Sequence, residues 1–317
     1  MTTYNVLGEI TTFDEKETII SHQYARIRKI ENVDKCKNLK ILQLISNCIE
    51  KIENLENNLE LENLELYENS IKKIENICML TNLKILDLSF NKIRIIENID
   101  TLINLEELYL SSNKIAKIEN LQNCKKLRLL ELGYNKIRKI ENLENLTNLE
   151  ELWLGKNKIE ELNIPFFPKL KKLSLQHNRL TNWSVDSIQN IPQVTELYVS
   201  YNKLSFIIDN IKELKHLKVF DLSYNEIENI LICSELKSVE ELWLNNNNIH
   251  NIEMIKNLRE NENLKTLYLE KNEIQETLKD NYRSQIISIL PQLKQLDALP
   301  ISPIKVSQSQ TSSRPKE

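Results

Sequence analysis

Aromatic and acidic side chains recur together at one position of this sequence, about every 22 residues. The series is Gln43, Glu65, Asp87, Tyr109, Glu131, Trp153, Ser174, Tyr198, Asp221, Trp243 and Tyr268. Five of its eleven members are aromatic, although aromatic residues make up only 6% of the chain. Tryptophan and tyrosine dominate the energetics of protein interfaces, and carboxylates attract basic partners. The chemistry that the series predicts is protein binding, with aromatic anchors in an acidic field.

Side chains that could support catalysis or metal binding lack the spacing that such chemistry needs. The histidines His22, His177, His216 and His250 form no H-x-x-x-H or H-E-x-x-H motif, and G-x-S-x-G is absent from the sequence. With only 3 glycines, phosphate-cradling loops are disfavoured. Carboxylate pairs such as Asp87 with Glu131 are expected on an open face with no apolar pocket to raise one pKa. We expect no enzymatic activity, no cofactor and no metal.

These residues belong to the repeat L-x-x-L-x-L-x-x-N, as in LKILDLSFN from Leu83 to Asn91. The closing asparagine recurs in steps of 21 to 25 residues, at Asn47, Asn69, Asn91, Asn113, Asn135, Asn157, Asn178, Asn202, Asn225, Asn247 and Asn272. This pattern predicts an α/β leucine-rich-repeat solenoid of about eleven 22-residue repeats. We expect a curved parallel sheet on its concave face and 3-10 or short helices on its convex face. Each asparagine amide should satisfy turn backbone groups that would otherwise be buried and unpaired.

Strand geometry predicts which side chains of the repeat reach solvent. When the second and third leucines point inward, the residue between them points out of the concave face, so the series forms a central column there. Glu107, Glu151, Glu196 and Glu241, two positions before column residues, should face the same way. A plainer alternative is that the aromatic residues are strand formers that pack laterally on one another. Trp183 occupies a position that other repeats fill with isoleucine, which predicts a core location.

A solenoid needs a cap at each end, because its terminal coils would otherwise expose leucines. We expect an N-terminal segment and cap at 1–37, the solenoid at 38–272, a C-terminal cap at 273–300 and a disordered tail at 301–317. The C-terminal cap should contain Tyr282 and an apolar helical stretch from Ile286 to Leu290.

Charge and cysteine content restrict the compartment and the partners. A net charge of -4 is too mild to indicate a nucleic-acid coat. Neither a signal-peptide core nor a run of about 18 apolar residues occurs, and the 5 cysteines form no C-x-x-C pair. We expect a soluble cytosolic or nuclear protein with reduced thiols and no membrane partner.

A series of basic residues follows the asparagines: Lys72, Lys73, Lys92, Arg94, Lys114, Lys117, Lys136, Arg138 and Lys139. Glutamates accompany it at Glu53, Glu75, Glu97, Glu119 and Glu141. RNA-binding domains normally carry net positive charge, so we expect a solvated, mutually paired edge and no nucleic-acid partner.

The repeats, for example KIRKIENLENLTNLEELWLGKNKI, and the C-terminal segments YLEKN, NYR and LPQLKQLDA resemble the protein phosphatase 1 regulatory subunit 7 family, from about Ile27 to Ala298. The resemblance implies a non-catalytic regulatory subunit that binds the phosphatase catalytic subunit through its concave face. Such a subunit would modulate phosphatase activity, maturation or targeting in nucleus and cytoplasm, alongside a third regulatory subunit. The matching partner-binding positions are Asp87, Tyr109, Glu131, Trp153, Asp221, Glu241, Trp243 and Tyr268.

The sequence departs from the family pattern at particular places. Tyr109 and Trp153 stand where the resemblance leads us to expect phenylalanine, and the C-terminal cap lacks the usual proline after the last asparagine. The repeat consensus is also similar to that of axonemal dynein light chain and spliceosomal leucine-rich proteins. Two alternatives therefore stay open, a ciliary or axonemal, microtubule-associated adaptor and an RNA-particle scaffold.

Overall fold

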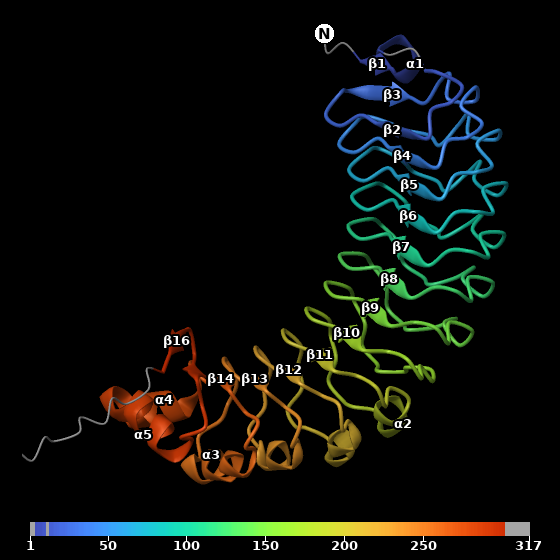
Figure 1. Cartoon of the computed structure of the whole chain (residues 1–317). Coiled ribbons are helices and arrows are strands. Elements are labelled where there is room, and N and C mark those ends of the chain that lie inside the picture. Colours follow the sequence, from blue (N-terminus) through green and yellow to red (C-terminus); the bar gives the residue numbers. More distant parts are fainter. Residues whose placement is uncertain (1–3, 11–12, 302–317) are drawn as a thin grey trace, which may run out of the picture.

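Short strands stacked side by side form one long curved sheet. The structure, a computed structural model, describes residues 4–10 and 13–301. Within this part the main sheet has 14 strands in the order β16-β15-β14 and on through β4 to β2, and all neighbours are parallel except β15 and β16. The strands line the inner side of an arc (Figure 1). The predicted leucine-rich-repeat solenoid is confirmed. Residues 302–317, nearly all of the predicted disordered tail, lie outside the described residues.

Each repeat contributes one three-residue strand. The repeat strands are β4 (Ile41–Gln43), β5 (Asn63–Glu65), β6 (Ile85–Asp87), β7 (Glu107–Tyr109), β8 (Leu129–Glu131), β9 (Glu151–Trp153), β10 (Lys172–Ser174), β11 (Glu196–Tyr198), β12 (Val219–Asp221), β13 (Glu241–Trp243) and β14 (Thr266–Tyr268). The middle residue of every one of these strands is buried, and the pairing register aligns it with its equivalents, as Leu86 aligns with Leu108. Alternation along the strand therefore turns the third residue toward the concave face.

The closing asparagines form a hydrogen-bonded ladder, and most of them are buried. Nδ2 of Asn91 donates to the carbonyl oxygens of Leu66 at 2.9 Å, Leu88 at 3.1 Å and Ser89 at 3.1 Å. Its Oδ1 accepts from the backbone N of Ile71 at 2.9 Å. One amide thus satisfies four backbone groups in two neighbouring coils, as predicted, because a short amide presents donors and an acceptor at once.

A second asparagine of the repeat follows the glutamate of the I-E-N segment, in the left-handed backbone region. Asn98 has φ 58°, and its Nδ2 donates to the carbonyl oxygen of Ile74 at 2.6 Å. Asparagine tolerates this conformation better than other non-glycine residues. The equivalent asparagines Asn32, Asn54, Asn76, Asn120 and Asn142 share this conformation, so the N-terminal coils make the turn without glycine.

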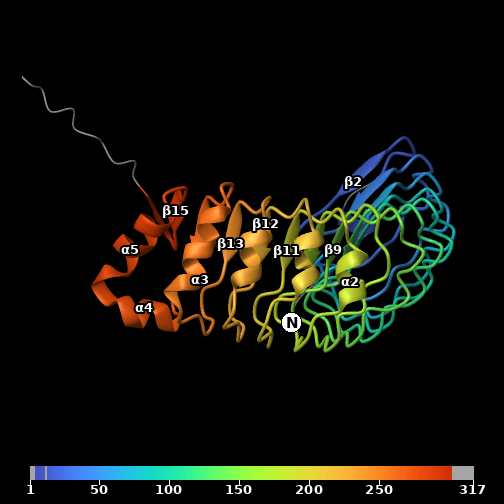
Figure 2. The same cartoon turned by 90° about the horizontal axis from the view of Figure 1, so that it is seen from below.

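The convex returns differ along the solenoid. From β10 onward they contain short helices: α2 (Val185–Gln189), η1 (Asp209–Glu213), η2 (Leu231–Glu235), α3 (Ile252–Asn257) and η3 (Leu258–Glu260), where η marks a 3-10 helix. The described returns between β4 and β10 are made of turns and bends instead. The 24- and 25-residue steps before Asn202 and Asn272 contain α2 and α3, so the longer repeats have room for a helix. Figure 2 shows these helices together on the outer side of the C-terminal half.

The sheet continues into the predicted N-terminal segment, although the division into 1–37 and 38–272 stays a prediction. Strand β2 (Ile19–Ser21) pairs in parallel with β4, because Ile20 takes the buried middle position. Beside it β1 (Asn5–Val6) pairs with β3 (Ile27–Lys29). Helix α1 (Leu7–Ile10) packs Leu7 into the core at this end.

A helical hairpin and a last strand pair close the C-terminal end. They comprise α4 (Glu273–Leu278), η4 (Lys279–Asn281), α5 (Tyr282–Ile289), β15 (Gln295–Leu296) and β16 (Leu299–Pro300). Tyr282, Ile286 and Leu290 are buried against the final coil. The Tyr282 hydroxyl donates to Oδ2 of Asp297 at 3.1 Å, and Arg283 donates to the carbonyl oxygen of Leu296 at 3.0 Å.

Trp183 lies in the core, as its repeat position predicts. Its side chain is 9% exposed, and its ring lies 6.3 Å from that of Phe220 in an edge-on arrangement. The indole Nε1 donates to the carbonyl oxygen of Phe206 at 2.7 Å. A partner for this polar atom explains how a tryptophan replaces isoleucine inside the solenoid.

The cysteines of the described chain are free thiols. Cys36, Cys124 and Cys233 are buried as small core residues, whereas Cys48 is half-buried and Cys78 is exposed. Burial raises the pKa of the Cys124 thiol to about 11, which keeps it protonated and unreactive.

Candidate protein-binding face

The central column lies along the concave face, one residue per coil. Pairing aligns Asp87 with Tyr109, Tyr109 with Glu131, and Trp243 with Tyr268 on adjacent strands. The structure brings the eight predicted partner-binding residues to this face in two groups. Asp87, Tyr109, Glu131 and Trp153 occupy β6 to β9, and Asp221, Glu241, Trp243 and Tyr268 occupy β12 to β14.

The aromatic rings of the column are held by glutamates two residues earlier on their own strands. The indole Nε1 of Trp153 donates to Oε2 of Glu151 at 3.1 Å. Residues two apart on a strand point to the same face, so the sequence E-L-W or E-L-Y places this acceptor beside the ring. The same bond, at 2.8 Å, joins Tyr109 to Glu107 and Tyr198 to Glu196.

Column aromatics also pack on one another across strands. The rings of Trp153 and Tyr198 lie 6.4 Å apart and nearly parallel, and those of Trp243 and Tyr268 lie 5.3 Å apart. Lateral packing, the plainer alternative for these residues, is therefore present. It leaves all four rings half-buried, with part of each still open to the concave side.

Trp243 differs from its equivalent Trp153. Its Nε1 is buried yet has no hydrogen-bond partner in the described part of the chain, although Glu241 occupies the position that Glu151 has beside Trp153. An unpaired buried donor costs about 1 to 3 kcal/mol. The indole N–H of Trp243 therefore lacks the hydrogen bond that Tyr109, Trp153 and Tyr198 each make.

Asp221 does not face solvent, contrary to the alternation-based expectation. The residue is 2% exposed, and its Oδ1 accepts from the backbone N of Ser223 at 3.0 Å and from the Ser223 hydroxyl at 2.6 Å. These two hydrogen bonds from Ser223 hold the carboxylate against the sheet. Ser174 in the same column is buried as well.

Asp87 and Glu131 lie in less polar surroundings than an open face would give. Burial is the main cause that raises the pKa of both carboxyls. The Asp87 carboxylate further raises the pKa of Glu131, and the Glu65 carboxylate further raises that of Asp87. The Tyr109 ring lies between them in the strand register. The expectation that no environment here shifts a carboxyl pKa is therefore wrong, because a bulky neighbour excludes water from the column.

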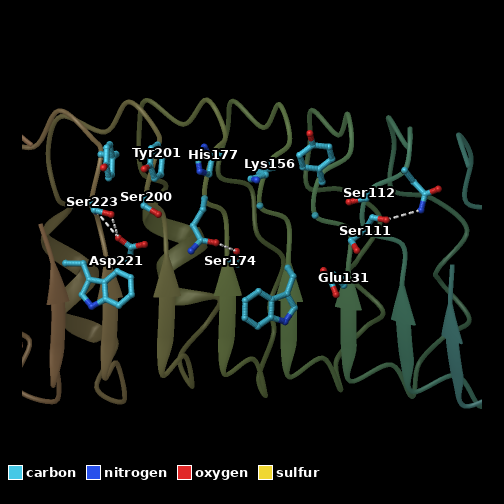
Figure 3. A pocket seen from close by; sticks show the side chains of 18 of the residues that line it. Ser111, Ser112, Glu131, Lys156, Ser174, His177, Ser200, Tyr201, Asp221 and Ser223 are labelled. Atoms are coloured by element: carbon cyan, nitrogen blue, oxygen red, sulfur yellow. Dashed lines mark hydrogen bonds between the residues drawn. The ribbon is translucent and has the colours of Figure 1, made fainter. Parts of the chain in front are cut away.

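A groove of about 1140 Å³ runs beside the column toward the carboxyl ends of the strands. Glu131, Trp153 and Trp243 line one side. The other side is a turn ridge, defined as Tyr134, Lys156, His177, Tyr201 and Tyr224. In Figure 3, Lys156, His177 and Tyr201 stand in a row along this edge.

Exposed and half-buried rings stack along the turn ridge. The ring of Tyr201 lies 3.9 Å from those of His177 and Tyr224, with an 11° angle between planes in each pair. Nζ of Lys156 lies 5.2 Å from the centre of the Tyr134 ring, which is itself 61% exposed. The groove therefore has aromatic surface on both sides.

Sequence reasoning missed the turn ridge. Its members precede the closing asparagines in G-Y-N, G-K-N, Q-H-N and S-Y-N, so reading that column as well would have revealed them. They adopt φ between 52° and 55°, a region that bulky residues rarely occupy. Aromatic side chains therefore occupy turn positions where glycine or asparagine would fit the backbone with less strain.

The basic series that follows the asparagines is less paired than expected. Among the described residues, one ion pair joins that series to its accompanying glutamates: Lys117 lies 3.6 Å from Glu119. Seven ion pairs of the described residues lie instead along the opposite edge of the sheet, as between Lys84 and Glu62 at 2.6 Å. The long side chains of the series extend into solvent, where pairing contributes little.

Comparison with protein families agrees with the fold. A family model described as "Leucine rich repeat" matches residues 168–227, one described as "Leucine Rich repeats (2 copies)" matches 103–145 and 125–166, and a further "Leucine Rich repeat" model matches 80–94. The chain is a leucine-rich-repeat protein.

Curated relatives match parts of the chain. Fibromodulin of Sus scrofa is 35% identical over 89 residues, which is 28% of this chain and 59% of the relative. Acidic leucine-rich nuclear phosphoprotein 32 family member A of Drosophila melanogaster is 30% identical over 138 residues, 41% of this chain and 52% of the relative. The chain thus spans less than two thirds of the length of these relatives.

Solved structures resemble most of the chain. An internalin of Listeria monocytogenes superposes with a TM-score of 0.70 at 25% identity, covering 90% of this chain and 88% of its own. A leucine-rich-repeat protein of Leptospira interrogans gives 0.67 at 27% identity, covering 84% and 74%. Together with the repeats, these likenesses give the chain the architecture of a protein-interaction scaffold.

Two kinds of feature are absent from the described residues. No helix there is both long and apolar enough to cross a membrane. No group of three or more histidine, cysteine, aspartate or glutamate side chains there could hold a metal ion.

Proposed function

We propose that this protein is a non-catalytic regulatory subunit that binds the catalytic subunit of protein phosphatase 1 through its concave face. The observation that carries the proposal is the central column, where aromatic rings and carboxylates share one groove. The resemblance of the repeats and of the C-terminal segments YLEKN, NYR and LPQLKQLDA supports this particular partner.

The column suits a large basic partner surface for physical reasons. Trp153 and Tyr109 are fixed by hydrogen bonds to Glu151 and Glu107, so little side-chain freedom is lost when a partner covers them. Glu131 stands between them on β8 and adds negative charge. Fixed aromatic anchors supply affinity, and the carboxylates steer a positively charged surface onto the groove.

Regulation would follow from holding the phosphatase in the arc. A partner seated on the concave face is covered over many coils, which would modulate its activity, its maturation or its targeting. A third regulatory subunit could join through the surfaces left free. The proposed setting is nucleus and cytoplasm.

Titration calorimetry of the purified full chain with the purified phosphatase catalytic subunit tests the proposal directly. A saturable binding isotherm supports it, and the absence of heat and of co-elution on size exclusion would contradict it. A pull-down from lysate, read by mass spectrometry, then separates the alternatives. Recovery of axonemal or microtubule proteins without phosphatase would favour the ciliary adaptor, and RNA-particle proteins would favour the RNA-particle scaffold.

A further inference from the structure

The residue that directly precedes each repeat strand belongs to a charge ladder along the amino-terminal edge of the sheet. Backbone hydrogen bonds join successive members, as between Glu106 N and the carbonyl oxygen of Lys84 at 2.8 Å. The ladder is Lys40, Glu62, Lys84, Glu106, Arg128, Glu150, Lys171, Thr195, Lys218, Glu240 and Lys265. Basic and acidic residues alternate along it, with Thr195 as the exception.

Each acidic member lies between two basic ones. Glu62 pairs with Lys40 at 3.3 Å and with Lys84 at 2.6 Å. Glu240 likewise pairs with Lys218 at 3.6 Å and with Lys265. The alternation therefore lets one carboxylate neutralise the lysines of both flanking coils.

Thr195 interrupts this pattern by placing a neutral side chain where a carboxylate is due. Its backbone joins Lys171 on one side and Lys218 on the other, each at 2.8 Å. Its hydroxyl donates to the carbonyl oxygen of Lys171 at 3.1 Å and brings no charge. The ion pairs of Lys171, with Glu150 at 2.7 Å, and of Lys218 lie only on their outer sides.

Thr195 lies in a hollow of about 500 Å³ that collects more basic groups. Nζ of Lys169 donates to the amide oxygen of Asn148 at 2.7 Å, and Nζ of Lys215 donates to the carbonyl oxygen of Lys212 at 2.9 Å. These acceptors are neutral, and neither ammonium group forms an ion pair with a carboxylate of the described residues. The nearby Glu150 carboxylate senses the charge of Lys169 without pairing with it. Lys171, Lys218 and His216 complete the basic lining, and Glu150 is the carboxylate among the lining residues.

We infer that this hollow binds a phosphoryl oxyanion, which takes the place of the carboxylate missing at Thr195. A phosphoryl group carries up to two negative charges and three acceptor oxygens, so it can accept from several ammonium groups at once. Charge-assisted hydrogen bonds of this kind are about twice as strong as neutral ones. The shared chemistry is the phosphoryl group, either in a free phosphate compound or on a phosphorylated side chain of a partner.

The hollow is separate from the proposed phosphatase-binding column. Thr195 precedes β11, whereas the column residues end their strands, and six of them line the groove toward the other edge. Oxyanion binding can therefore be measured with the full chain alone. A lack of oxyanion binding would not contradict phosphatase binding by the column. A lack of phosphatase binding would likewise not contradict the oxyanion site.

Calorimetry with inorganic pyrophosphate at low ionic strength is the first test. The wild type should bind, and Thr195→Glu should weaken binding roughly tenfold or more, because the missing carboxylate is restored. Thr195→Val is the matched control, since it removes the hydroxyl, adds no charge and should keep the affinity. Lys215→Gln should weaken binding to a similar degree.

Thermal unfolding of each variant separates a lost site from a lost fold. Thr195→Glu should melt at or above the wild-type temperature, since it completes the ladder between Lys171 and Lys218. The inference is overturned if the wild type shows no pyrophosphate binding, or if Thr195→Glu binds as tightly as Thr195→Val.

Peptides distinguish the two sources of the phosphoryl group. A phosphoserine peptide and its unphosphorylated form are titrated beside pyrophosphate. Tighter binding of the phosphopeptide than of pyrophosphate supports the site and assigns it to a modified partner. Binding of pyrophosphate with none of either peptide supports the site for a free compound, and equal binding of both peptides contradicts recognition of phosphate.

Discussion

The indole Nε1 of Trp153 donates to the carboxylate of Glu151 on the same strand, at 3.1 Å. This bond orients a large ring on the concave face before any partner arrives. A ring that is already fixed loses little freedom on binding, so more of its contact energy appears as affinity. Hydrogen bonds within single strands therefore preorganise the aromatic side chains of the column for partner binding.

Trp243→Ala is expected to weaken binding of the phosphatase catalytic subunit about thirtyfold, a loss of roughly 2 kcal/mol at an interface anchor. Trp243 is half-buried beside Tyr268, and its unpaired Nε1 means that removal breaks no hydrogen bond within the described chain. Its melting temperature should stay close to that of the wild type. Calorimetry checks the affinity, and a Trp153, Trp243 double alanine variant with unchanged affinity would exclude the concave-face mechanism.

Trp183→Ala should produce the opposite pattern. This ring is buried against Phe220 and bonded to the carbonyl oxygen of Phe206, so its loss leaves a cavity and an unpaired acceptor. The free energy of unfolding should fall by about 3 to 5 kcal/mol. Denaturant unfolding measures this change, while affinity measured at a temperature where the variant is folded should match the wild type. An unaltered unfolding midpoint would contradict the core assignment.

The period of the repeat made the fold predictable in unusual detail. Every Leu86-type position is buried and every closing asparagine bonds to backbone, because stacking identical coils leaves one solution for the leucines and one for the amide. Asp221 was not predictable from alternation alone. Its burial depends on Ser223, which lies beyond the strand and donates twice to the carboxylate.

Features that depend on side-chain direction were also beyond the sequence pattern. The turn ridge of Tyr134, Lys156, His177, Tyr201 and Tyr224 arises because left-handed turns aim these residues along one edge. The raised pKa values of Asp87 and Glu131 come mainly from burial, which depends on how the surrounding side chains cover each carboxyl. Neither effect follows from residue type at a given spacing.

Asn113→Ala should destabilise the solenoid by about 2 to 5 kcal/mol, since each buried backbone group left unpaired costs about 1 to 3 kcal/mol. Asn113 donates to the carbonyl oxygens of Leu88 and Leu110 and accepts from the backbone N of Ile93. Asn123→Ala is the control, because Asn123 is exposed and makes a single bond to Asp100. A surface change of that kind should stay within about 0.5 kcal/mol. Equal unfolding midpoints for the two variants would contradict the ladder's structural role.

Asp87→Asn should change the pH dependence of stability. The pKa of Asp87 is raised in the folded protein, mainly by burial, so the folded state holds its proton more strongly than the unfolded state. The contribution of Asp87 to the free energy of unfolding is therefore fully present below the ordinary carboxyl pKa of about 4. It is lost as the pH rises through the raised pKa of the folded state. The variant keeps an oxygen that can accept from Ser89 N but has no charge to bury. Urea unfolding over this window should show the variant gaining on the wild type as pH rises, and a constant difference would contradict the shift.

Truncation after Asn281 tests the C-terminal cap. The deletion removes α5, β15 and β16, and with them the buried side chains of Ile286, Leu290 and Leu296. Three leucine-sized side chains contribute roughly 5 to 9 kcal/mol when buried, at about 1.5 to 3 kcal/mol each. The leucines of β14 would lose their cover as well, so we expect a lower melting temperature and cooperative loss of the terminal coils.

A shorter deletion provides the matched control for that truncation. Removing residues 302–317 leaves every described cap contact in place, including the bonds from Arg283 to the carbonyl oxygens of Leu296 and Pro300. Its melting temperature should equal that of the full chain. Hydrogen exchange shows which coils are destabilised. In the longer deletion, the backbone amides of β13 and β14 should lose protection, whereas those of β6 should keep it. Repeat proteins couple mainly to their nearest neighbours, so the loss should decay along the arc from the exposed end. Unchanged protection at β14 after truncation at Asn281 would show that the last coil is stable without its cap.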